Sequence, residues 1–345
     1  MSVSLAQMKR MDPREFVDGL LELTILGSFS KIGYAVRRRL FGWTAPAADS
    51  LAGRTVLITG PTSGLGRAAA IEFASLGAHL ILVGRSVGKL ESLRAELSAA
   101  NAADGCRLIV ADMGSLDSVR AAVDEILETE TVLDVLVDNA GAIFPDRITG
   151  PDGIEATLAT MVVGPFALVS GLMPLLQRSE DGRVIAVTSG GQYTQPLDLN
   201  DLQSSQGSFS GPRAYARAKR AQVALVREWQ RRLGPSGVTF NAVHPGWAAT
   251  PGLADSLPAF YRSMGPILRT PSEGIDSMVW LGTTTEGGLD NGRLYLDRRP
   301  RPFDRVPGTR LTGDERRRLW DHVVALSGAP DPTPERWRSP RDQAA

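Results

Sequence analysis

The chain has 345 residues, of which 43% are hydrophobic, 22% charged and 6% aromatic, a composition typical of soluble globular proteins. Its 38 basic and 38 acidic residues leave no net charge to attract nucleic acid, so no nucleic-acid partner is expected. The single cysteine, Cys106, cannot form an internal disulfide, and the three scattered histidines cannot build a metal site. We therefore expect a cytoplasmic protein with no metal.

Residues 1–50 differ from the rest of the chain and predict an appended helical segment with a linker at 44–50. Apolar residues within 16–29 recur at helical spacing, which predicts an amphipathic helix. Acidic residues interrupt this stretch, so it fits neither a membrane span nor a signal peptide. The helix packs on the domain or on a partner subunit. Alternatively, residues 16–39 make a peripheral membrane contact in which the arginines at 37–39 face lipid headgroups.

From residue 51, short apolar runs alternate with helical patterns. Strands are expected at 55–59, 80–83, 108–111, 132–137, 184–187, 238–243 and 293–296, and helices at 65–76, 87–100, 116–128, 157–176, 215–233 and 273–281. This alternation predicts an α/β fold: a single Rossmann-type domain over 51–297, with a doubly wound parallel sheet of about seven strands and helices on both faces. Residues 298–345 predict a C-terminal extension with one helix, opened by a capping box at Thr312, and a frayed tail.

The first expected strand runs into the glycine-rich sequence TGPTSGLG at 59–66, directly before a helix. Its glycines permit a tight turn, close approach of a pyrophosphate and close packing of the helix on the strand. The helix N-terminus supplies free N–H groups for phosphate. An ordinary glycine-rich turn is the alternative, but the flanking strand and helix favour dinucleotide binding. The expected cofactor-binding residues here are Gly60, Thr62, Ser63, Gly64, Leu65 and Gly66.

The end of the second strand bears on the choice of cofactor. An NAD-selective site usually has an acidic residue there, but this strand ends in Gly84 and Arg85. A guanidinium at Arg85, assisted by Arg67, can bind the 2′-phosphate of NADP. NADP(H) is therefore the preferred cofactor, with NAD as the alternative if Arg85 is only a surface arginine.

Two further strand ends carry candidate cofactor-binding residues. Asp112 and Met113 follow the third strand, where a carboxylate can accept a hydrogen bond from adenine. Asn139, Ala140 and Gly141 end the fourth strand, where small residues let the backbone border the adenine ribose. Each can also be a plain turn residue, but successive strand ends are where open α/β sheets bind ligands.

A candidate catalytic group opens the long helix after the fifth strand. Tyr215 and Lys219 are four positions apart, so both lie on one helical face. A phenol has a pKa near 10, and a neighbouring ammonium can lower it enough for proton exchange at neutral pH. Ser189 follows the fifth strand at the same sheet edge and can hydrogen-bond a reacting oxygen. This predicts an acid/base pair with an oxygen-binding partner beside a nicotinamide.

These motifs together resemble the short-chain dehydrogenase/reductase family over about residues 51–297. The resemblance implies that Tyr215 is the general acid/base, that Lys219 lowers its pKa and holds the nicotinamide ribose, and that Ser189 orients the substrate oxygen. It further implies a homo-oligomer built on the helices near 157–176 and 215–233. Cofactor contacts are also implied after the sixth strand, at Pro245, Gly246, Trp247 and Thr250.

Two positions depart from the family pattern. The usual catalytic asparagine falls on Met161, and Asp138 replaces a second asparagine. Methionine cannot make the side-chain bond, although its backbone carbonyl can still hold a relay water, so slowed proton relay is expected rather than a dead site. The alternative is a cofactor-binding regulatory or scaffold protein with weak or lost catalysis.

The segment after the sixth strand is rich in large apolar residues between 247 and 267. Loops beyond strand ends carry specificity, so this segment predicts a lid over a small lipophilic carbonyl or alcohol. A subunit interface is the alternative. The polar residues between Ser189 and Tyr215 predict a surface flap, and His244 is expected to be a structural imidazole. The expected function is NADP(H)-dependent interconversion of a carbonyl and an alcohol.

Overall fold

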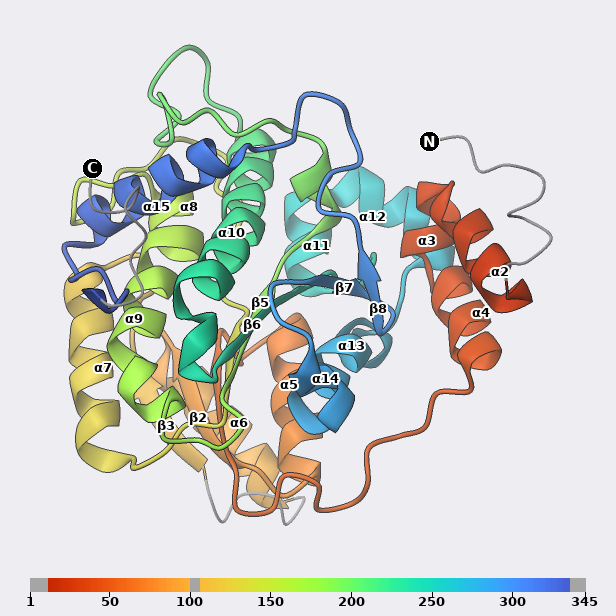
Figure 1. The fold of residues 1–345 in the computed structure, drawn as a ribbon, viewed down its shortest axis with the longest axis horizontal. Coiled ribbons are helices and arrows are strands. Elements are labelled where there is room, and N and C mark those ends of the chain that lie inside the picture. Colours follow the sequence, from red (N-terminus) through yellow and green to blue (C-terminus); the bar gives the residue numbers. More distant parts are fainter. Residues whose placement is uncertain (1–11, 100–105, 336–345) are drawn as a thin grey trace.

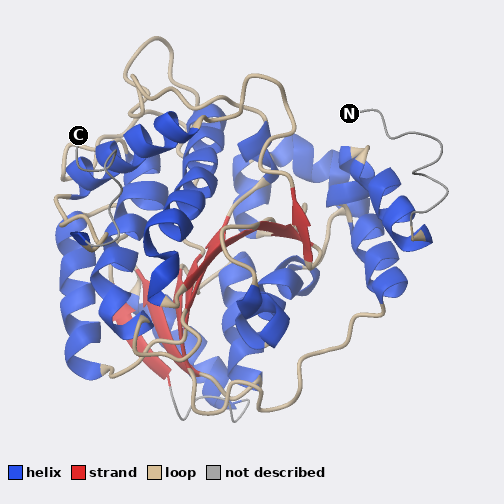
Figure 2. Cartoon of the chain, in the orientation of Figure 1, coloured by secondary structure: helices blue, strands red, loops and turns tan. Residues whose placement is uncertain are grey.

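The computed structural model describes residues 12–99 and 106–335, which form one eight-stranded sheet covered by helices on both faces (Figures 1 and 2). The order is β3-β2-β1-β4-β5-β6-β7-β8, and β8 alone is antiparallel to its neighbour. This confirms the predicted doubly wound fold and adds one short strand. The strands are β1 (Thr55–Thr59), β2 (His79–Gly84), β3 (Cys106–Val110), β4 (Val135–Asp138), β5 (Arg183–Val187), β6 (Thr239–Val243), β7 (Leu294–Leu296) and β8 (Arg299–Arg301).

Successive side chains of each central strand enter two different hydrophobic clusters. In β1, Val56 and Ile58 pack in one cluster, whereas Leu57 packs in the other. Strands buried on both faces read as continuous apolar runs, which is why the sequence located them well. The first cluster lies under α5 (Gly64–Ser75), α6 (Val87–Ala99) and α13 (Pro271–Thr283), and the second under α7 (Leu116–Thr129), α9 (Gly164–Leu176) and α10 (Gly211–Leu233). Short helices α11 (Pro251–Ser256), α12 (Pro258–Met264) and α14 (Thr285–Leu289) follow β6.

The stretch expected as one helix at 157–176 contains a π-helical turn. It consists of α8 (Ala156–Leu158), the π-turn Ala159–Val163 and α9. Ala156–Leu176 is long and apolar enough to cross a bilayer, with a mean hydropathy of 1.8, but 78% of that window is buried inside the protein. Such burial is typical of the core helix of a soluble domain.

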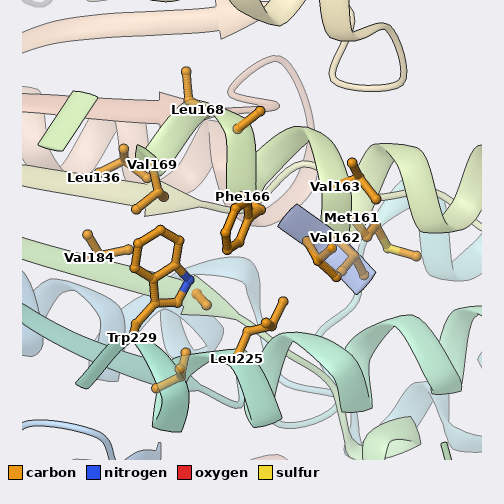
Figure 3. Packing of buried hydrophobic residues seen from close by; sticks show 14 of the residues in the cluster. Leu136, Met161, Val162, Val163, Phe166, Leu168, Val169, Val184, Leu225 and Trp229 are labelled. Carbon is orange, nitrogen blue, oxygen red and sulfur yellow. The ribbon is translucent and has the colours of Figure 1, made fainter. Parts of the chain in front are cut away.

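The C-terminal extension is part of the core. In α15 (Gly313–Ser327), Thr312 and Glu315 form the predicted capping box, and Trp320 is completely buried. The Trp320 ring lies 4.7 Å from Trp229 of α10 and 4.9 Å from Phe166 of α9. Figure 3 shows Phe166 and Trp229 facing each other within this cluster. Helix α15 therefore covers α9 and α10, the helices on which a homo-oligomer was expected. The predicted frayed tail falls largely on 336–345, outside the described residues.

The described part of the N-terminal appendage, from residue 12 on, folds into three helices where one was predicted: α2 (Pro13–Glu22), α3 (Ile25–Phe29) and α4 (Lys31–Phe41). The predicted single helix is divided at Thr24 and Ser30, because each of these residues caps the N-terminus of a new helix. The three helices lie beyond β8, at the edge of the sheet (Figure 1). Helices α2 and α4 turn three charged side chains, Asp18, Glu22 and Arg37, toward the domain, beside the buried rings of Phe29 and Tyr34.

Buried ion pairs fix this segment to the domain. Arg37 is fully buried and contacts Asp18 at 2.6 Å, Glu22 at 2.6 Å and Asp297 at 2.7 Å. Arg269 also binds Asp297, at 2.6 Å and 2.9 Å. At the start of the predicted linker, the carbonyl oxygen of Thr44 accepts a bond of 3.0 Å from Arg298, so the appendage is held there as well.

The second anchor comes from the arginine-rich stretch that starts with the β7–β8 turn. Arg298 pairs with Asp276 through two bonds of 2.7–2.8 Å and lies 5.1 Å from the Trp43 ring. Arg301 binds both carboxylate oxygens of Asp18 at 2.8–2.9 Å. The arginines after residue 297 therefore hold the N-terminal helices against the sheet edge.

Candidate active site

The glycine turn after β1 has the backbone that the sequence predicts. Gly60 and Gly64 have φ angles of +65° and +53°, which residues with side chains rarely adopt. A Cβ on Gly66 would lie 2.1 Å from the carbonyl oxygen of Gly60. Helix α5 starts without a side-chain bond from its N-cap, Ser63. The exposed Ser63 hydroxyl and the first N–H groups of α5 therefore fit an anionic ligand.

Asn139 holds this turn. Its side-chain nitrogen donates to the carbonyl oxygens of Thr59 and Gly60 at 2.9 and 3.1 Å. In return, the Thr59 hydroxyl accepts the backbone N–H groups of Asn139 and Ala140 at 3.0 and 2.9 Å. The ends of β1 and β4 are thus locked together where the strand order reverses, which is where such sheets bind ligands. Sequence reasoning missed the part played by Thr59.

The other predicted cofactor residues differ in their surroundings. Arg85 is exposed and forms no ion pair within the described part of the chain, whereas Arg67 is paired with Glu96. Asp112 accepts the N–H of Gly114 at 2.9 Å, so one of its oxygens is used in a turn. Thr62 and Leu65 are half-buried within the glycine turn, and Met113 is buried in the core.

The structure brings Ser189, Tyr215 and Lys219 together at the carboxyl edge of the sheet. The Ser189 hydroxyl lies close enough to Tyr215 to lower the pKa of the phenol. Lys219 is buried, donates to the carbonyl oxygen of Val187 at 2.8 Å, and lies 5.7 Å from the centre of the Tyr215 ring. The Ser189 hydroxyl also accepts the N–H of Gly191 at 3.3 Å, which fixes its position after β5.

Burial shifts the pKa of both titratable groups in this cluster. It raises the pKa of Tyr215, and the nearby Ser189 hydroxyl opposes that rise. Burial lowers the pKa of Lys219 to about 8, and the nearby Asp138 charge opposes that fall. The Val187 carbonyl holds the Lys219 ammonium beside Tyr215, and the expected lowering of the Tyr215 pKa by Lys219 stays a prediction.

Asp138 forms a second buried charge behind Lys219, and sequence reasoning treated it only as a departure from the family pattern. Its Oδ2 accepts a bond of 2.8 Å from Gln222, while its buried Oδ1 has no hydrogen-bond partner in the described structure. Burial raises the pKa of Asp138 to about 6, whereas Lys219 and Gln222 lower it. Asp138 is thus a counter-charge for Lys219.

Met161 lies in the π-turn and is fully buried. A Cβ built on Gly141 would lie 3.0 Å from the Met161 sulfur and 3.6 Å from the Lys219 nitrogen. The thioether therefore borders the same small space as the Lys219 ammonium. An apolar group stands there in place of the expected asparagine.

The loop after β6 closes the site. His244 is buried, and its Nδ1 accepts the N–H of Gly246 at 2.8 Å. Burial, then the nearby arginines, lower the pKa of His244 to about 3, so this ring is neutral and structural. Thr250 caps α11 and lies against the glycine turn, since a Cβ on Gly64 would be 3.2 Å from the Thr250 side chain. Pro245 is buried beside them.

Trp247 connects this loop to the N-terminal segment. Its backbone N–H donates to the carbonyl oxygen of Phe29 at 2.8 Å, and its carbonyl accepts from Arg269 at 2.7 Å. The Phe29 ring lies 4.3 Å from His244 and 5.9 Å from Trp247. No local sequence signal marks Phe29, because its partners lie more than 150 positions away.

Residues 54–259 match the family model described as short chain dehydrogenase. The chain belongs to this family. Human dehydrogenase/reductase SDR family member 12 is 36% identical over 249 residues, which are 72% of this chain and 78% of that protein. Human retinol dehydrogenase 13 is 28% identical over 332 residues, 93% of this chain and 99% of that protein. The Pseudomonas aeruginosa RhlG/NADP active-site complex has a TM-score of 0.59 and 25% identity, covering 73% of this chain and 96% of that one.

As a short-chain dehydrogenase, the chain is an NAD(P)-dependent oxidoreductase that acts on CH–OH or carbonyl groups. The glycine turn fits such a cofactor. Gly60, Gly64 and Gly66 carry no side chain, so a pyrophosphate can approach the backbone there. Ser189, Tyr215 and Lys219 lie beyond the ends of the neighbouring strands. The family resemblance expected from the sequence is confirmed.

Proposed function

We propose that the chain is an NADP(H)-dependent oxidoreductase that interconverts a carbonyl and an alcohol on a lipophilic substrate. The observation that carries this proposal is the grouping of Tyr215 with Ser189 and with buried Lys219, which lies on the same face of α10 as Tyr215. When bound, the nicotinamide supplies or accepts a hydride at the substrate carbon. Tyr215 gives a proton to the substrate oxygen or removes it, and Ser189 orients that oxygen.

Tyr215 needs help to exchange protons near neutral pH, because burial raises its pKa. Lys219 is within reach to supply that help, and Asp138 keeps its ammonium charged in a buried site. In this proposal, Lys219 binds the nicotinamide ribose and stabilises the Tyr215 phenolate. The Val187 carbonyl fixes where the ammonium lies.

NADP(H) is the proposed cofactor because Arg85 follows β2 with an exposed guanidinium that has no acidic partner among the residues that the structure describes. A free guanidinium can pair with a 2′-phosphate, whereas a carboxylate there would repel it. Arg67 is a weaker candidate than the sequence suggested, because Glu96 already neutralises it.

A lipophilic substrate is proposed from the half-buried apolar residues beyond β6. Trp247 stacks edge-on against Phe260 of α12, with ring centres 5.1 Å apart, and Leu253, Leu257 and Met264 are half-buried beside them. One relative of this chain is named retinol dehydrogenase, after a lipophilic alcohol. The name of this relative supports a lipophilic substrate class but identifies no particular substrate of this chain.

The proposal is tested by fluorescence titration with NADPH and NADH, followed by turnover on a panel of aliphatic and aromatic carbonyls. We expect tighter binding of NADPH and consumption that requires both a carbonyl and Tyr215. Tighter binding of NADH would contradict the role of Arg85. Cofactor binding without turnover on any carbonyl would contradict the proposed catalysis.

A second candidate function is supported by one observation. Met161 places a buried thioether next to Lys219, where the family resemblance implies an asparagine. This departure fits a regulatory or scaffold protein that binds NADP(H) without catalysing a reaction. Met161→Asn distinguishes the two: a large gain in turnover from an inactive wild type favours the cofactor-binding role, and a small change in an active enzyme favours catalysis.

A further inference from the structure

The exposed face of the N-terminal helices is apolar. In α2, Phe16 and Leu20 are exposed at i and i+4, and Leu23 follows at i+7 with 80% of its surface exposed. The exposed side chains of α3 and α4 continue this face with Ile25, Leu26, Ile32 and Val36. Such a concentration is unusual for a protein surface, where large apolar residues are mostly scattered singly.

The charged residues on the opposite face of the same helices explain why the apolar residues point outward. Asp18 and Glu22 lie one turn apart in α2, on the side away from Phe16 and Leu20. Both bind Arg37, and Arg301 binds Asp18 as well. Because the charged sides of α2 and α4 are held in buried ion pairs, the helices cannot turn their apolar sides inward without breaking those pairs.

Basic residues border the apolar face. Lys31, Arg38 and Arg39 on α4 are exposed, and none of them forms an ion pair within residues 12–99 and 106–335. The acidic residues of the same helices are engaged: Asp18 and Glu22 are in the buried ion pairs, and Glu15 pairs with Arg299. The outward charge near the apolar face is therefore positive.

We propose that helices α2–α4 dock the protein on an anionic lipid surface, with their apolar side chains entering the headgroup region and Lys31, Arg38 and Arg39 pairing with phosphates. A second copy of the chain fits less well. A twofold contact would bring the same cations of both copies together, whereas anionic headgroups neutralise them. This inference is independent of the proposed catalysis, because it concerns lipid binding alone.

The N-terminal helices are bonded to the substrate loop on the side that faces the domain. The last residue of α3, Phe29, accepts a bond from Trp247, the residue that opens the apolar segment leading to α11 and α12. Arg269, at the far end of that segment, also donates to the Phe29 and Ser28 carbonyls. The lipid-facing helices and the loop proposed to cover the substrate are thus joined by direct bonds.

The test is co-sedimentation of the full chain with vesicles of phosphatidylcholine, with and without phosphatidylglycerol. We expect binding to the anionic vesicles alone, and a loss of at least roughly tenfold in partitioning for L20S/L23S/L26S. Replacing Lys31, Arg38 and Arg39 with glutamine should weaken it roughly a hundredfold. The matched controls are Leu289→Ser, 77% exposed on α14, and Lys89→Gln on α6, which should bind like wild type.

A fluorescent probe distinguishes insertion from simple adhesion. A polarity-sensitive dye on Leu23→Cys, in a Cys106→Ser background, should shift to shorter wavelength with anionic vesicles, and the same dye on Leu289→Cys should not. No binding by wild type, or equal binding by the leucine variant, overturns the proposal. A solution dimer that the leucine variant dissociates also overturns it, by assigning the face to a second copy.

Discussion

The backbone N–H of Trp247 donates to the carbonyl oxygen of Phe29 at 2.8 Å, and the rings of these residues meet edge to face 5.9 Å apart. Phe29 belongs to the N-terminal appendage, and Trp247 belongs to the loop after β6, where cofactor contacts are expected. The appendage therefore supports the loop that borders the candidate site. Phe29 also contacts His244 and borders Gly190, the residue after Ser189.

Phe29→Leu should lower kcat/KM more than its effect on stability explains. The smaller side chain leaves space behind His244 and Trp247, so the loop at 244–250 loses its fixed position. The matched control is Phe73→Leu, which alters a fully buried phenylalanine in the other core cluster. Both variants should lose about 1–2 kcal/mol in urea unfolding, but only Phe29→Leu should raise KM. Equal kinetics for the two would contradict a positioning role.

Arg37→Leu should destabilise the folded protein by about 3–5 kcal/mol, because it leaves the buried Asp18 and Asp297 carboxylates without one of their arginine partners. Arg39→Leu, on the same helix but exposed, serves as control and should change stability by less than about 0.5 kcal/mol. Urea unfolding followed by tryptophan fluorescence measures both. A neutral Arg37→Leu would show that the ion pairs do not hold the appendage.

Asp138→Asn should move the basic limb of the kcat/KM pH profile to lower pH, by up to about one unit. The sign follows from the buried pair: burial lowers the pKa of Lys219 to about 8, and the Asp138 charge opposes that fall. Without the charge, Lys219 loses its proton at lower pH. Asp198→Asn on the surface flap removes the same charge elsewhere and should leave the profile unchanged. A basic limb that does not move in Asp138→Asn would show that Asp138 is not the counter-charge of Lys219.

Arg85→Glu should weaken NADPH binding by roughly ten- to a hundredfold while leaving NADH binding within about threefold, because a carboxylate repels the 2′-phosphate. Lys89→Glu makes the same charge change on the exposed side of α6 and controls for long-range effects. Fluorescence titration gives both dissociation constants. Parallel loss of the two cofactors would point to a damaged fold instead of a specific phosphate contact.

The sheet and the glycine turn could be predicted because their signals are local. Parallel strands buried on both faces are continuous apolar runs, and the turn at Gly60 needs glycines at fixed spacing. Strand β8 was missed because Pro300 and its flanking arginines have no strand character.

The orientation of the appendage could not be predicted from its sequence. Periodicity locates the apolar side of a helix but not the side that meets the protein, and here the partner of Arg37 is Asp297, 260 positions away. The surroundings of Tyr215 could not be predicted for a related reason. Helical spacing places Lys219 nearby, but only the folded chain shows the burial that raises the Tyr215 pKa and the Val187 carbonyl that holds the ammonium.

The most direct test of the account is single-turnover oxidation of NADPH by a carbonyl, compared between wild type and Tyr215→Phe. Tyr34→Phe, which removes the hydroxyl of a buried tyrosine in α4, is the matched control. We predict that Tyr215→Phe binds NADPH normally but transfers hydride at least about a hundredfold more slowly, the contribution typical of a positioned acid/base. Hydride transfer at the wild-type rate by Tyr215→Phe would contradict the assignment of Tyr215 as the proton donor.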